Sequence, residues 1–314
     1  MRAPRQSISG VVQSLGEHLP GPAIRTDGLT KRFGDHTAVD DLTFEVHPGV
    51  VTGFLGPNGA GKTTTMRMLL GLAAPTAGSA TVLGMPYRDI GRTSDVGVLL
   101  DAAVFHPKRT ARNHLRWIAA ASEIDPVRID EVVELVGLHR DADRHVGEYS
   151  LGMRQRLGLG TALLGEPRVL VLDEPANGLD PAGIRWMRQF LASFARAGGA
   201  VFVSSHQLGE MSLLADEVIV IARGRLVTQT TTQRLTSGSV TSTRVRAADP
   251  ERFAAVVRER DLEASFRDDG ALIVGSAPPV VGELAAAHDL VLHELVAETH
   301  SLEDVFLEIT ESAP

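Results

Sequence analysis

The nine residues GPNGAGKTT at positions 56–64 restrict the possible folds of this chain more than any other stretch. They fit the pattern Gly-x-x-x-x-Gly-Lys-Ser/Thr, which points to phosphate binding when it lies between a buried strand and a helix. Both neighbours are expected here, because VVTGFLG (50–56) is typical of an apolar strand and a helical pattern begins near Lys62. The stretch therefore predicts an α/β fold in which a strand, a glycine-rich loop and a helix follow one another. The alternative is a glycine-rich turn before a helix with no ligand.

The chain from about 23 to 225 alternates short β-branched segments with helical patterns, as the βαβ units of a largely parallel sheet do. RVLVLDEP (168–175) is a nearly continuous apolar run, which is typical of a strand buried on both faces. AVFVSSH (200–206) and EVIVIARGRLV (217–227) predict further strands, whereas the pattern between about 110 and 165 is helical.

Polar composition marks the limits of this α/β region. Residues 1–22 are rich in Ser, Gly, Pro and Gln and predict a mobile N-terminal extension. The Thr- and Ser-rich stretch 228–242 predicts a linker. We therefore expect an N-terminal α/β domain over 23–230 with a helical subdomain at about 105–165, then a linker over 231–242, then a small C-terminal α+β domain over 243–314.

The C-terminal region has its own pattern, which predicts the order βαββαβ, a ferredoxin-like order. A last short helix, SLEDVFLEIT (301–310), would begin at a capping box formed by Ser301 and Asp304. The expected elements are a strand at 243–248, a helix at 250–260, strands near 262–267 and 271–275, a helix at 278–288 and a strand at 290–298.

Composition excludes several classes of function. The 314 residues contain no cysteine, so disulfides, thiolate metal sites and cysteine nucleophiles are excluded. A net charge of −8 argues against a protein that binds nucleic acid through a basic face. Because no run of about eighteen apolar residues occurs, the sequence predicts no membrane-spanning segment.

The glycine-rich loop has the chemistry of a nucleotide triphosphate site. Its glycines let backbone N–H groups close around phosphates, and Lys62 would reach the β- and γ-phosphates. The hydroxyl of Thr63 would ligate Mg²⁺. The residues that we expect to contact the nucleotide here are Gly56, Pro57, Asn58, Gly59, Ala60, Gly61, Lys62, Thr63 and Thr64.

Three more polar residues follow buried strands. Asp173 ends an apolar run, where a carboxylate is costly unless it meets a cation, and Mg²⁺ shared with Thr63 is the natural cation. Glu174 would orient or activate water, and His206 would contact the γ-phosphate or that water. The alternatives are a solvated strand end for the two acids and a structural role for the histidine.

A second helix start also suits an anion. In EYSLGMRQRLGLG (148–160), Ser150 and Gly152 stand just before an amphipathic stretch that carries arginines. A helix that opens here offers free N–H groups and the positive end of its dipole. The stretch lacks the lysine and the glycine spacing of the first loop, so it predicts an incomplete phosphate site; the alternative is an ordinary capped helix.

Five motifs in order, GPNGAGKTT, YSLGMRQR, VLVLDEP, NGLD and SSH, resemble those of the ATP-binding cassette family over about residues 24–230. The resemblance implies a P-loop NTPase cassette with a RecA-like core and a helical subdomain. It makes 56–64 the Walker A motif and 169–174 the Walker B motif. It also implies that Glu174 is the catalytic glutamate, His206 the switch histidine, Asp180 the acid of the D-loop and Phe33 the aromatic residue that stacks on adenine; the alternative for Phe33 is an ordinary core or edge aromatic.

The resemblance also explains the incomplete site. YSLGM resembles the family's signature motif, and in the family that helix start binds the γ-phosphate of an ATP held by another cassette. Ser150 and Gly152 are kept here, whereas Leu151 and Met153 replace a Gly and a Gln. At the family's Q-loop glutamine this chain has Asp101, which would ligate Mg²⁺ or water or, in the alternative, cap a loop.

The tail SLEDVFLEIT resembles that of ATP-binding subunits of ABC-2-type exporters, such as daunorubicin- and bacitracin-resistance cassettes. The resemblance implies a subunit that hydrolyses ATP with Mg²⁺ and powers export of a drug, an antibiotic or a lipid-like molecule. Its expected partners are a second cassette, in a homodimer, and a separate membrane permease, with a cytoplasmic helix of the permease entering a groove formed by 99–117. Nucleic acid is not an expected partner. The expected place is the cytoplasm, on the inner face of the membrane. The alternative is a soluble cassette ATPase that remodels a non-membrane partner.

Overall fold

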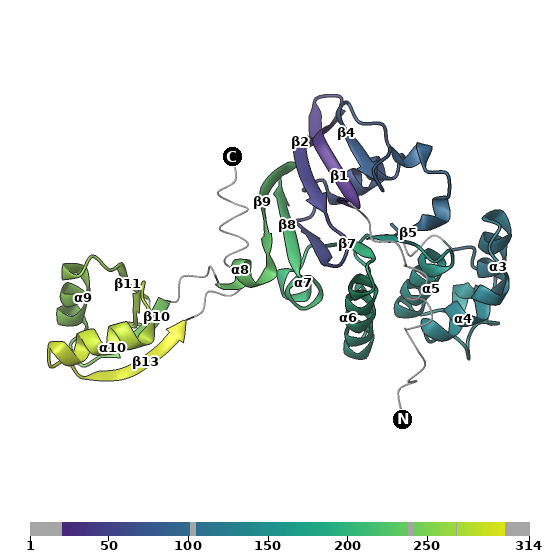
Figure 1. Cartoon of the computed structure of the whole chain (residues 1–314). Coiled ribbons are helices and arrows are strands. Elements are labelled where there is room, and N and C mark those ends of the chain that lie inside the picture. Colours follow the sequence, from purple (N-terminus) through teal and green to yellow (C-terminus); the bar gives the residue numbers. More distant parts are fainter. Residues whose placement is uncertain (1–20, 101–104, 238–241, 268, 299–314) are drawn as a thin grey trace. The chain divides into compact units, whose positions relative to one another are not determined.

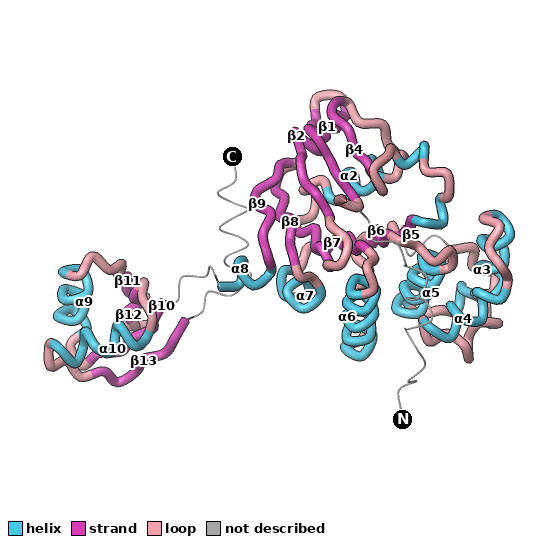
Figure 2. The backbone as a smooth tube through the Cα atoms, viewed as in Figure 1, coloured by secondary structure: helices cyan, strands magenta, loops and turns pink. Residues whose placement is uncertain are grey.

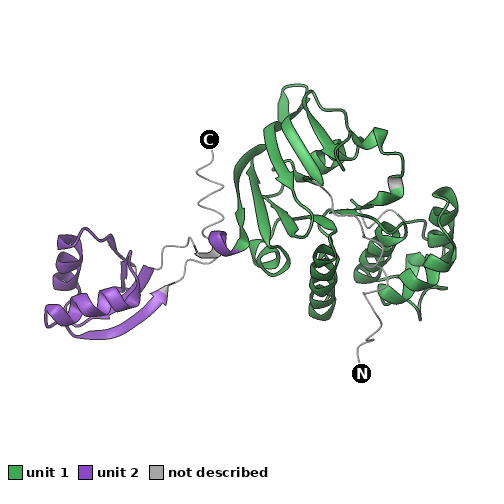
Figure 3. Ribbon diagram, viewed as in Figure 1, with its two compact units in different colours: residues 1–232, 313–314 green, residues 233–312 purple. Residues whose placement is uncertain are grey.

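The computed structural model describes residues 21–100, 105–237, 242–267 and 269–298. These residues form two compact units with a boundary between Thr232 and Gln233 (Figure 3). Unit 1 carries the glycine-rich loop, and unit 2 is the C-terminal part. Residues 1–20 of the extension expected over 1–22 lie outside the described residues, as do Asp101 and the expected helix 301–310.

The six-stranded sheet of unit 1 holds the strands that the apolar runs predicted. Its order is β5-β6-β7-β3-β8-β9, in which the first five strands are parallel and β9 pairs antiparallel with β8. Every residue of β3, β6 and β7 is buried, as continuous apolar strands require. The bounds are β3 Val51–Leu55, β5 Val96–Leu99, β6 Val169–Leu172, β7 Ala200–Ser205, β8 Glu217–Ala222 and β9 Arg225–Thr231.

A separate antiparallel sheet departs from the expected succession of parallel strands. It has the order β2-β1-β4, with β1 at Ile24–Phe33, β2 at His36–Val46 and β4 at Ala77–Val82. A tight turn with Gly34 at φ 57° joins β1 to β2, so these two strands pair as a hairpin. Helix α2 (Lys62–Leu69) lies between the two sheets (Figure 2).

One aromatic cluster holds the two sheets together. Phe44 of β2 lies 5.6 Å from Phe54 of β3 and 5.5 Å from Phe202 of β7, measured between ring centroids. All three rings are buried, and offset or tilted pairs at such distances add to the free energy gained by burying their surface. The strand that leads into the glycine-rich loop is thus held by a ring from the antiparallel sheet and by a ring from β7 beside it.

Helices cover the opposite face of the six-stranded sheet (Figure 1). They are α5 (Leu151–Leu163), α6 (Pro181–Arg196) and α7 (Leu208–Leu214). Glycines allow the close approach: a Cβ on Gly97 of β5 would lie 2.3 Å from the carbonyl oxygen of Ala162 in α5. Helices α3 (Ala111–Ala121) and α4 (Val127–Leu135) pack with α5 into the helical region predicted between 105 and 165.

The polar stretch 228–242, predicted as a linker, is in large part regular structure. Strand β9 continues to Thr231 and α8 follows at Thr232–Ser237. The boundary between the two units falls within this stretch, between Thr232 and Gln233, and its first residues belong to an edge strand of the sheet. The backbone of β9 pairs with β8, as in Val218↔Thr230. Its Thr and Gln side chains are exposed or half-buried, so the apolar residues that would indicate a strand are absent there.

Unit 2 shows the order βαββαβ expected over 243–298. Its four strands lie in the order β11-β12-β10-β13 and are all antiparallel, so the first and third strands of the unit pair at the centre. Phe253, Leu272 and Val281 lie in its own core. The bounds are β10 Ser242–Ala247, α9 Pro250–Glu259, β11 Ala264–Phe266, β12 Leu272–Val274, α10 Pro278–Ala287 and β13 Leu292–Glu298.

In the part of the chain that the structure describes, every helix is too short or too polar to span a bilayer.

Candidate functional site

The glycine-rich loop is folded as a cradle for an anion. Gly59 and Gly61 have φ angles of 82° and 103°, a region that favours glycine. A Cβ on Gly61 would lie 2.5 Å from the carbonyl oxygen of Ala38, and a Cβ on Gly56 would lie 2.6 Å from that of Ile221. Gly61 caps α2 without any side-chain hydrogen bond, so the first N–H groups of this helix are open to a ligand.

Lys62 supplies a cation at the floor of this cradle. Its Nζ donates to the carbonyl oxygens of Gly56 at 2.6 Å and Pro57 at 3.2 Å, and it lies 3.9 Å from Oε1 of Glu174. The side chain is only 7% exposed, and this burial lowers its pKa, while the charges of Glu174 and Asp173 act in the opposite direction. A phosphate would supply the negative charge that a buried ammonium needs.

Asp173 and Thr63 bring two oxygen atoms together from different elements. The Thr63 hydroxyl donates to Oδ2 of Asp173 at 2.7 Å, and the Ser204 hydroxyl donates to Oδ1 of the same carboxylate. Among the described residues no cluster of three or more His or acidic side chains could hold a metal. A cation between Thr63 and Asp173 would therefore take its other ligands from phosphate and water, a donor set that fits Mg²⁺.

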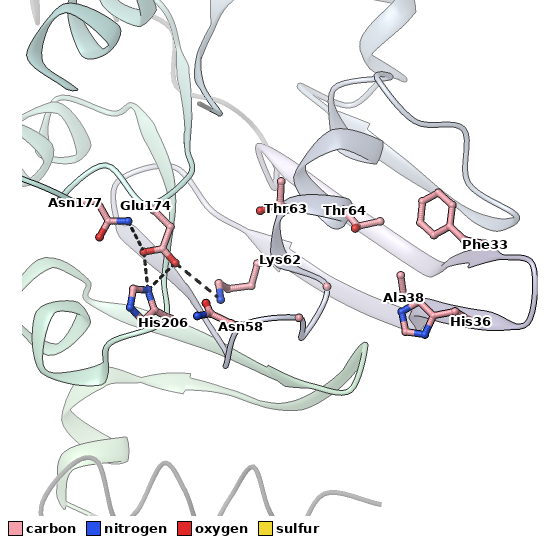
Figure 4. A pocket seen from close by; sticks show the side chains of 12 residues that line it. Phe33, His36, Ala38, Asn58, Lys62, Thr63, Thr64, Glu174, Asn177 and His206 are labelled. Carbon is pink, nitrogen blue, oxygen red and sulfur yellow. Dashed lines mark hydrogen bonds and ion pairs between the residues drawn. The ribbon is translucent and has the colours of Figure 1, made fainter. Parts of the chain in front are cut away.

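Glu174 meets three side chains at the open side of the cradle (Figure 4). Nδ1 of His206 lies 3.0 and 2.9 Å from the two carboxylate oxygens, and Nδ2 of Asn177 donates to Oε2 at 3.4 Å. Lys62 is the third neighbour. Glu174 has a φ of 49°, a conformation that costs a non-glycine residue roughly 1–3 kcal/mol and is concentrated at functional sites.

These side chains line one open pocket of about 580 Å³. Figure 4 shows Glu174, His206 and Asn177 together at one end of the labelled set and Phe33 with His36 and Ala38 at the other. Phe33 is 54% exposed, and Nζ of Lys31 lies 5.0 Å from its ring centroid. The lining residues are Phe33, His36, Ala38, Asn58, Gly59, Gly61, Lys62, Thr63, Thr64, Glu174, Asn177 and His206.

Three of the lining residues were not singled out from the sequence. His36 and Ala38 come from β2 and reach the pocket because Phe33 pairs with His36 across the hairpin, which no local pattern reveals. Asn177 belongs to the NGLD stretch, and its position three residues after Glu174 was the available signal. Conversely, Gly56, Pro57 and Ala60 of the loop do not line the pocket: Ala60 is buried, and the carbonyl oxygens of the other two accept from Lys62.

The second predicted anion site lies apart from this pocket. Ser150 caps α5 by accepting from the N–H of Met153 at 3.2 Å, and both Ser150 and Leu151 are exposed. A Cβ on Gly152 would lie 2.9 Å from the carbonyl oxygen of Gly178, so α5 touches the loop after Glu174. None of these residues lines the 580 Å³ pocket.

Tyr149 anchors the beginning of that helix. Its hydroxyl donates to the carbonyl oxygen of Asp141 at 2.6 Å, and burial together with the charge of Asp141 raises its pKa to about 12. Asp180 caps α6 by accepting from the N–H of Gly183 at 2.8 Å and is exposed outside the pocket. Asp101, the expected additional metal ligand, lies outside the described residues.

Comparison with known proteins gives matches over both units. Residues 39–177 match the model of the family described as ABC transporter, and residues 241–303 match a domain of unknown function (DUF8746). The uncharacterized ABC transporter ATP-binding protein YhcH of Bacillus subtilis is 37% identical, with 90% of this chain and 94% of that protein covered. The bacitracin transport ATP-binding protein BcrA of Enterococcus faecalis is 34% identical over the same shares of the two chains.

A Nod factor export ATP-binding protein I from Paraburkholderia xenovorans is 34% identical, with 93% of this chain and 98% of that protein covered. Among solved structures, an ATP-binding subunit of an ABC transporter superposes with a TM-score of 0.63 at 24% identity, covering 69% of this chain and 92% of the other. At that identity the structural likeness shows the fold, which is the P-loop cassette fold predicted from the sequence.

Proposed function

This chain belongs to the ATP-binding proteins of ABC transporters, which hydrolyse ATP to power transport, and from that premise we propose that two copies close around two ATP molecules to drive an exporter. The observation that carries the proposal is the unequal exposure of the two anion sites. One holds a buried lysine and two carboxylates, whereas the other is an exposed helix start capped by Ser150. In this proposal the exposed helix start of one copy covers the nucleotide held by the other copy.

In this proposal different pocket residues bind different parts of one ATP molecule. Lys62 and the N–H groups at the start of α2 hold the β- and γ-phosphates. Thr63 and Asp173 would hold Mg²⁺, which when bound neutralises charge on the phosphates. Phe33 stacks on the adenine at the far end of the pocket from Glu174, so the nucleotide would span it lengthwise.

Glu174 then accepts a proton from the water that attacks the γ-phosphate. Its carboxylate is available for this because its contacts to His206 and Asn177 fix it in place while 22% of the side chain stays accessible. His206 is a positioning residue in this scheme, since its ring bonds to the carboxylate. Ser150 and Gly152 of the second copy complete the site from its open side, with Asp180 nearby on the same copy.

The helical region is the proposed contact with a separate membrane permease. Trp117 of α3 is 57% exposed, and the guanidinium of Arg109 lies 5.0 Å from its ring centroid. An exposed indole next to a cation suits an amphipathic helix from a partner. This support comes from residues 105–117; within the groove predicted at 99–117, the structure describes 99–100 and 105–117. Binding there would hold the chain at the inner face of the membrane.

The proposed cargo is a drug, an antibiotic or a lipid-like molecule. Two relatives that match most of this chain support this proposal: one is named a bacitracin transport protein and the other a Nod factor export protein. The residues that contact cargo would belong to the permease, so the pocket of this chain carries no information on the cargo itself.

Capture of the partner tests this function. Tagged Glu174→Gln protein is expressed in its own host, membranes are dissolved in detergent with ATP, and proteins held by the tag are identified by mass spectrometry. Lys62→Ala with the same tag is the matched control, because it removes the cation for the phosphates. We expect an ATP-dependent partner with several spanning helices and no cassette of its own. Recovery of non-membrane partners alone would favour an ATPase that remodels such a partner.

A further inference from the structure

The backbone of Glu174 has three hydrogen-bond partners besides those of its carboxylate. Its N–H donates to the hydroxyl of Ser204 at 3.0 Å, and its carbonyl oxygen accepts from the N–H of Asn177 at 3.2 Å. The same carbonyl oxygen accepts from Nε2 of Gln155 at 3.4 Å. Because Glu174 has a φ of 49°, these bonds hold a conformation that it would otherwise leave.

Gln155 is an unusual residue to find at this place. Its side chain is 5% exposed, and within the described part of the chain its Oε1 has no hydrogen-bond partner. Burying an amide with an unsatisfied oxygen destabilises a fold, so packing alone favours an apolar residue here. The amide orientation is also determined, since a flipped amide would set two carbonyl oxygens against each other.

Gln155 lies on the helix that carries the second anion site. It follows Gly152 by three residues, which is about one turn of α5. The start of α5 also touches the loop after Glu174, because a Cβ on Gly178 would lie 2.3 Å from the Leu151 side chain. The first turns of α5 are therefore in contact with Glu174 directly through Gln155 and indirectly through Gly178.

We propose that Gln155 is a positioning residue that fixes the backbone of Glu174 and ties the carboxylate to the exposed start of α5. Gln155 does not line the nucleotide pocket, so it acts through Glu174 and not on ATP. The inference rests on the proposed function, since it requires Glu174 to act on the attacking water. An anion bound at Ser150 and Gly152 would then set the geometry of Glu174 across a single helical turn.

The test is the steady-state kinetics of the full chain carrying Gln155→Leu, which removes the amide at similar volume. We expect kcat for ATP hydrolysis to fall by roughly tenfold to a hundredfold, the range that a misplaced catalytic group produces. KM for ATP and the directly measured ATP affinity should stay within about twofold, because the pocket lining is unchanged. The melting temperature should hold or rise, since an unpaired buried oxygen is removed.

Two further variants separate positioning from general packing. Gln189→Leu replaces an exposed glutamine on α6 and should leave kcat unchanged. Gln155→Leu added to Glu174→Gln should not lower the residual rate further, because the group that Gln155 positions is already gone. A kcat for Gln155→Leu within twofold of wild type, or an equal loss in the Glu174→Gln background, would overturn the inference. Glu174→Gln alone tests the proposed role of Glu174 in hydrolysis. A failure of the proposed function can therefore be told apart from a failure of the inference about Gln155.

Discussion

Helix α2 begins at Gly61 and leaves its first N–H groups without a side-chain cap, whereas α5 begins at Ser150, whose hydroxyl oxygen accepts from Met153. Lys62 stands buried beside the first helix start, and Asp173 and Glu174 face it. The start of α5 is exposed at Ser150 and Leu151, and neither residue lines the pocket that holds Lys62 and Glu174. In the proposed function the first helix start holds a nucleotide and the second covers a nucleotide held by another copy.

The largest expected effect is at the first site. Glu174→Gln removes the proposed proton acceptor but keeps the shape of the side chain. We expect kcat for ATP hydrolysis to fall by about a hundredfold or more, with ATP binding retained. Phosphate release and equilibrium nucleotide binding measure the two quantities, and Glu259→Gln, on the exposed end of α9, is the control. Turnover at the wild-type rate would remove Glu174 from the mechanism.

The second site should respond in a different way. In Ser150→Asp the new carboxylate can still accept from the N–H of Met153, and it stands where an anion should approach. An acid in the first turn of a helix is compatible with its dipole, so α5 should still form. We expect hydrolysis to fall by roughly a hundredfold while a single chain binds ATP as before. Weakened binding by the single chain would mean that the two sites are not separate.

The aromatic end of the pocket should affect affinity and not the chemical step. Phe33→Ala removes a ring that is 54% exposed and available to a base. Loss of one base–aromatic stack costs about 1–3 kcal/mol, so Kd for ATP should rise roughly fivefold to a hundredfold. Calorimetry measures this, and Phe266→Ala, another exposed phenylalanine, is the matched control. An unchanged Kd would assign Phe33 to the fold alone.

The smallest effect concerns Tyr149, which anchors the start of α5. Because its pKa in the folded chain is raised to about 12 from the ordinary 10, its contribution to stability is complete below pH 10 and is lost between pH 10 and 12. The chain has only two tyrosines, so ultraviolet titration of phenolate can separate them. Tyr149→Phe should remove the step near pH 12 and flatten the loss of stability there. A Tyr149 step near pH 10 would contradict the buried anchor.

Strands β3, β6 and β7 could be predicted because they are buried on both faces, so their sequences are apolar throughout. The end of edge strand β9, residues 228–231, could not, since solvent reaches its side chains and Thr and Gln replace apolar residues. The antiparallel pairing of β1, β2 and β4 was also missed. That arrangement depends on contacts between residues far apart in the chain, as in Ile24↔Val82.

The phosphate end of the pocket was predictable because one continuous loop supplies most of its groups. The bond between His206 and the Glu174 carboxylate required the structure, since it joins the ends of β6 and β7, whereas the bond from Asn177 lies within one loop. No sequence pattern predicted that His36 lines the pocket or that Gln155 donates to the Glu174 carbonyl oxygen. Chemistry within a loop can be predicted from local pattern, whereas chemistry between elements depends on how they pack.

The central claim is that each chain supplies one half of two nucleotide sites, and mixing two inactive variants tests it most directly. Lys62→Ala disables the first site and keeps Ser150 and Gly152 intact, whereas Ser150→Asp does the reverse. In a mixed pair, one of the two composite sites has both halves intact. We predict that equal amounts of the two variants regain a clear fraction of wild-type ATP hydrolysis, although each alone is nearly inactive. A mixture no more active than its parts would contradict the account.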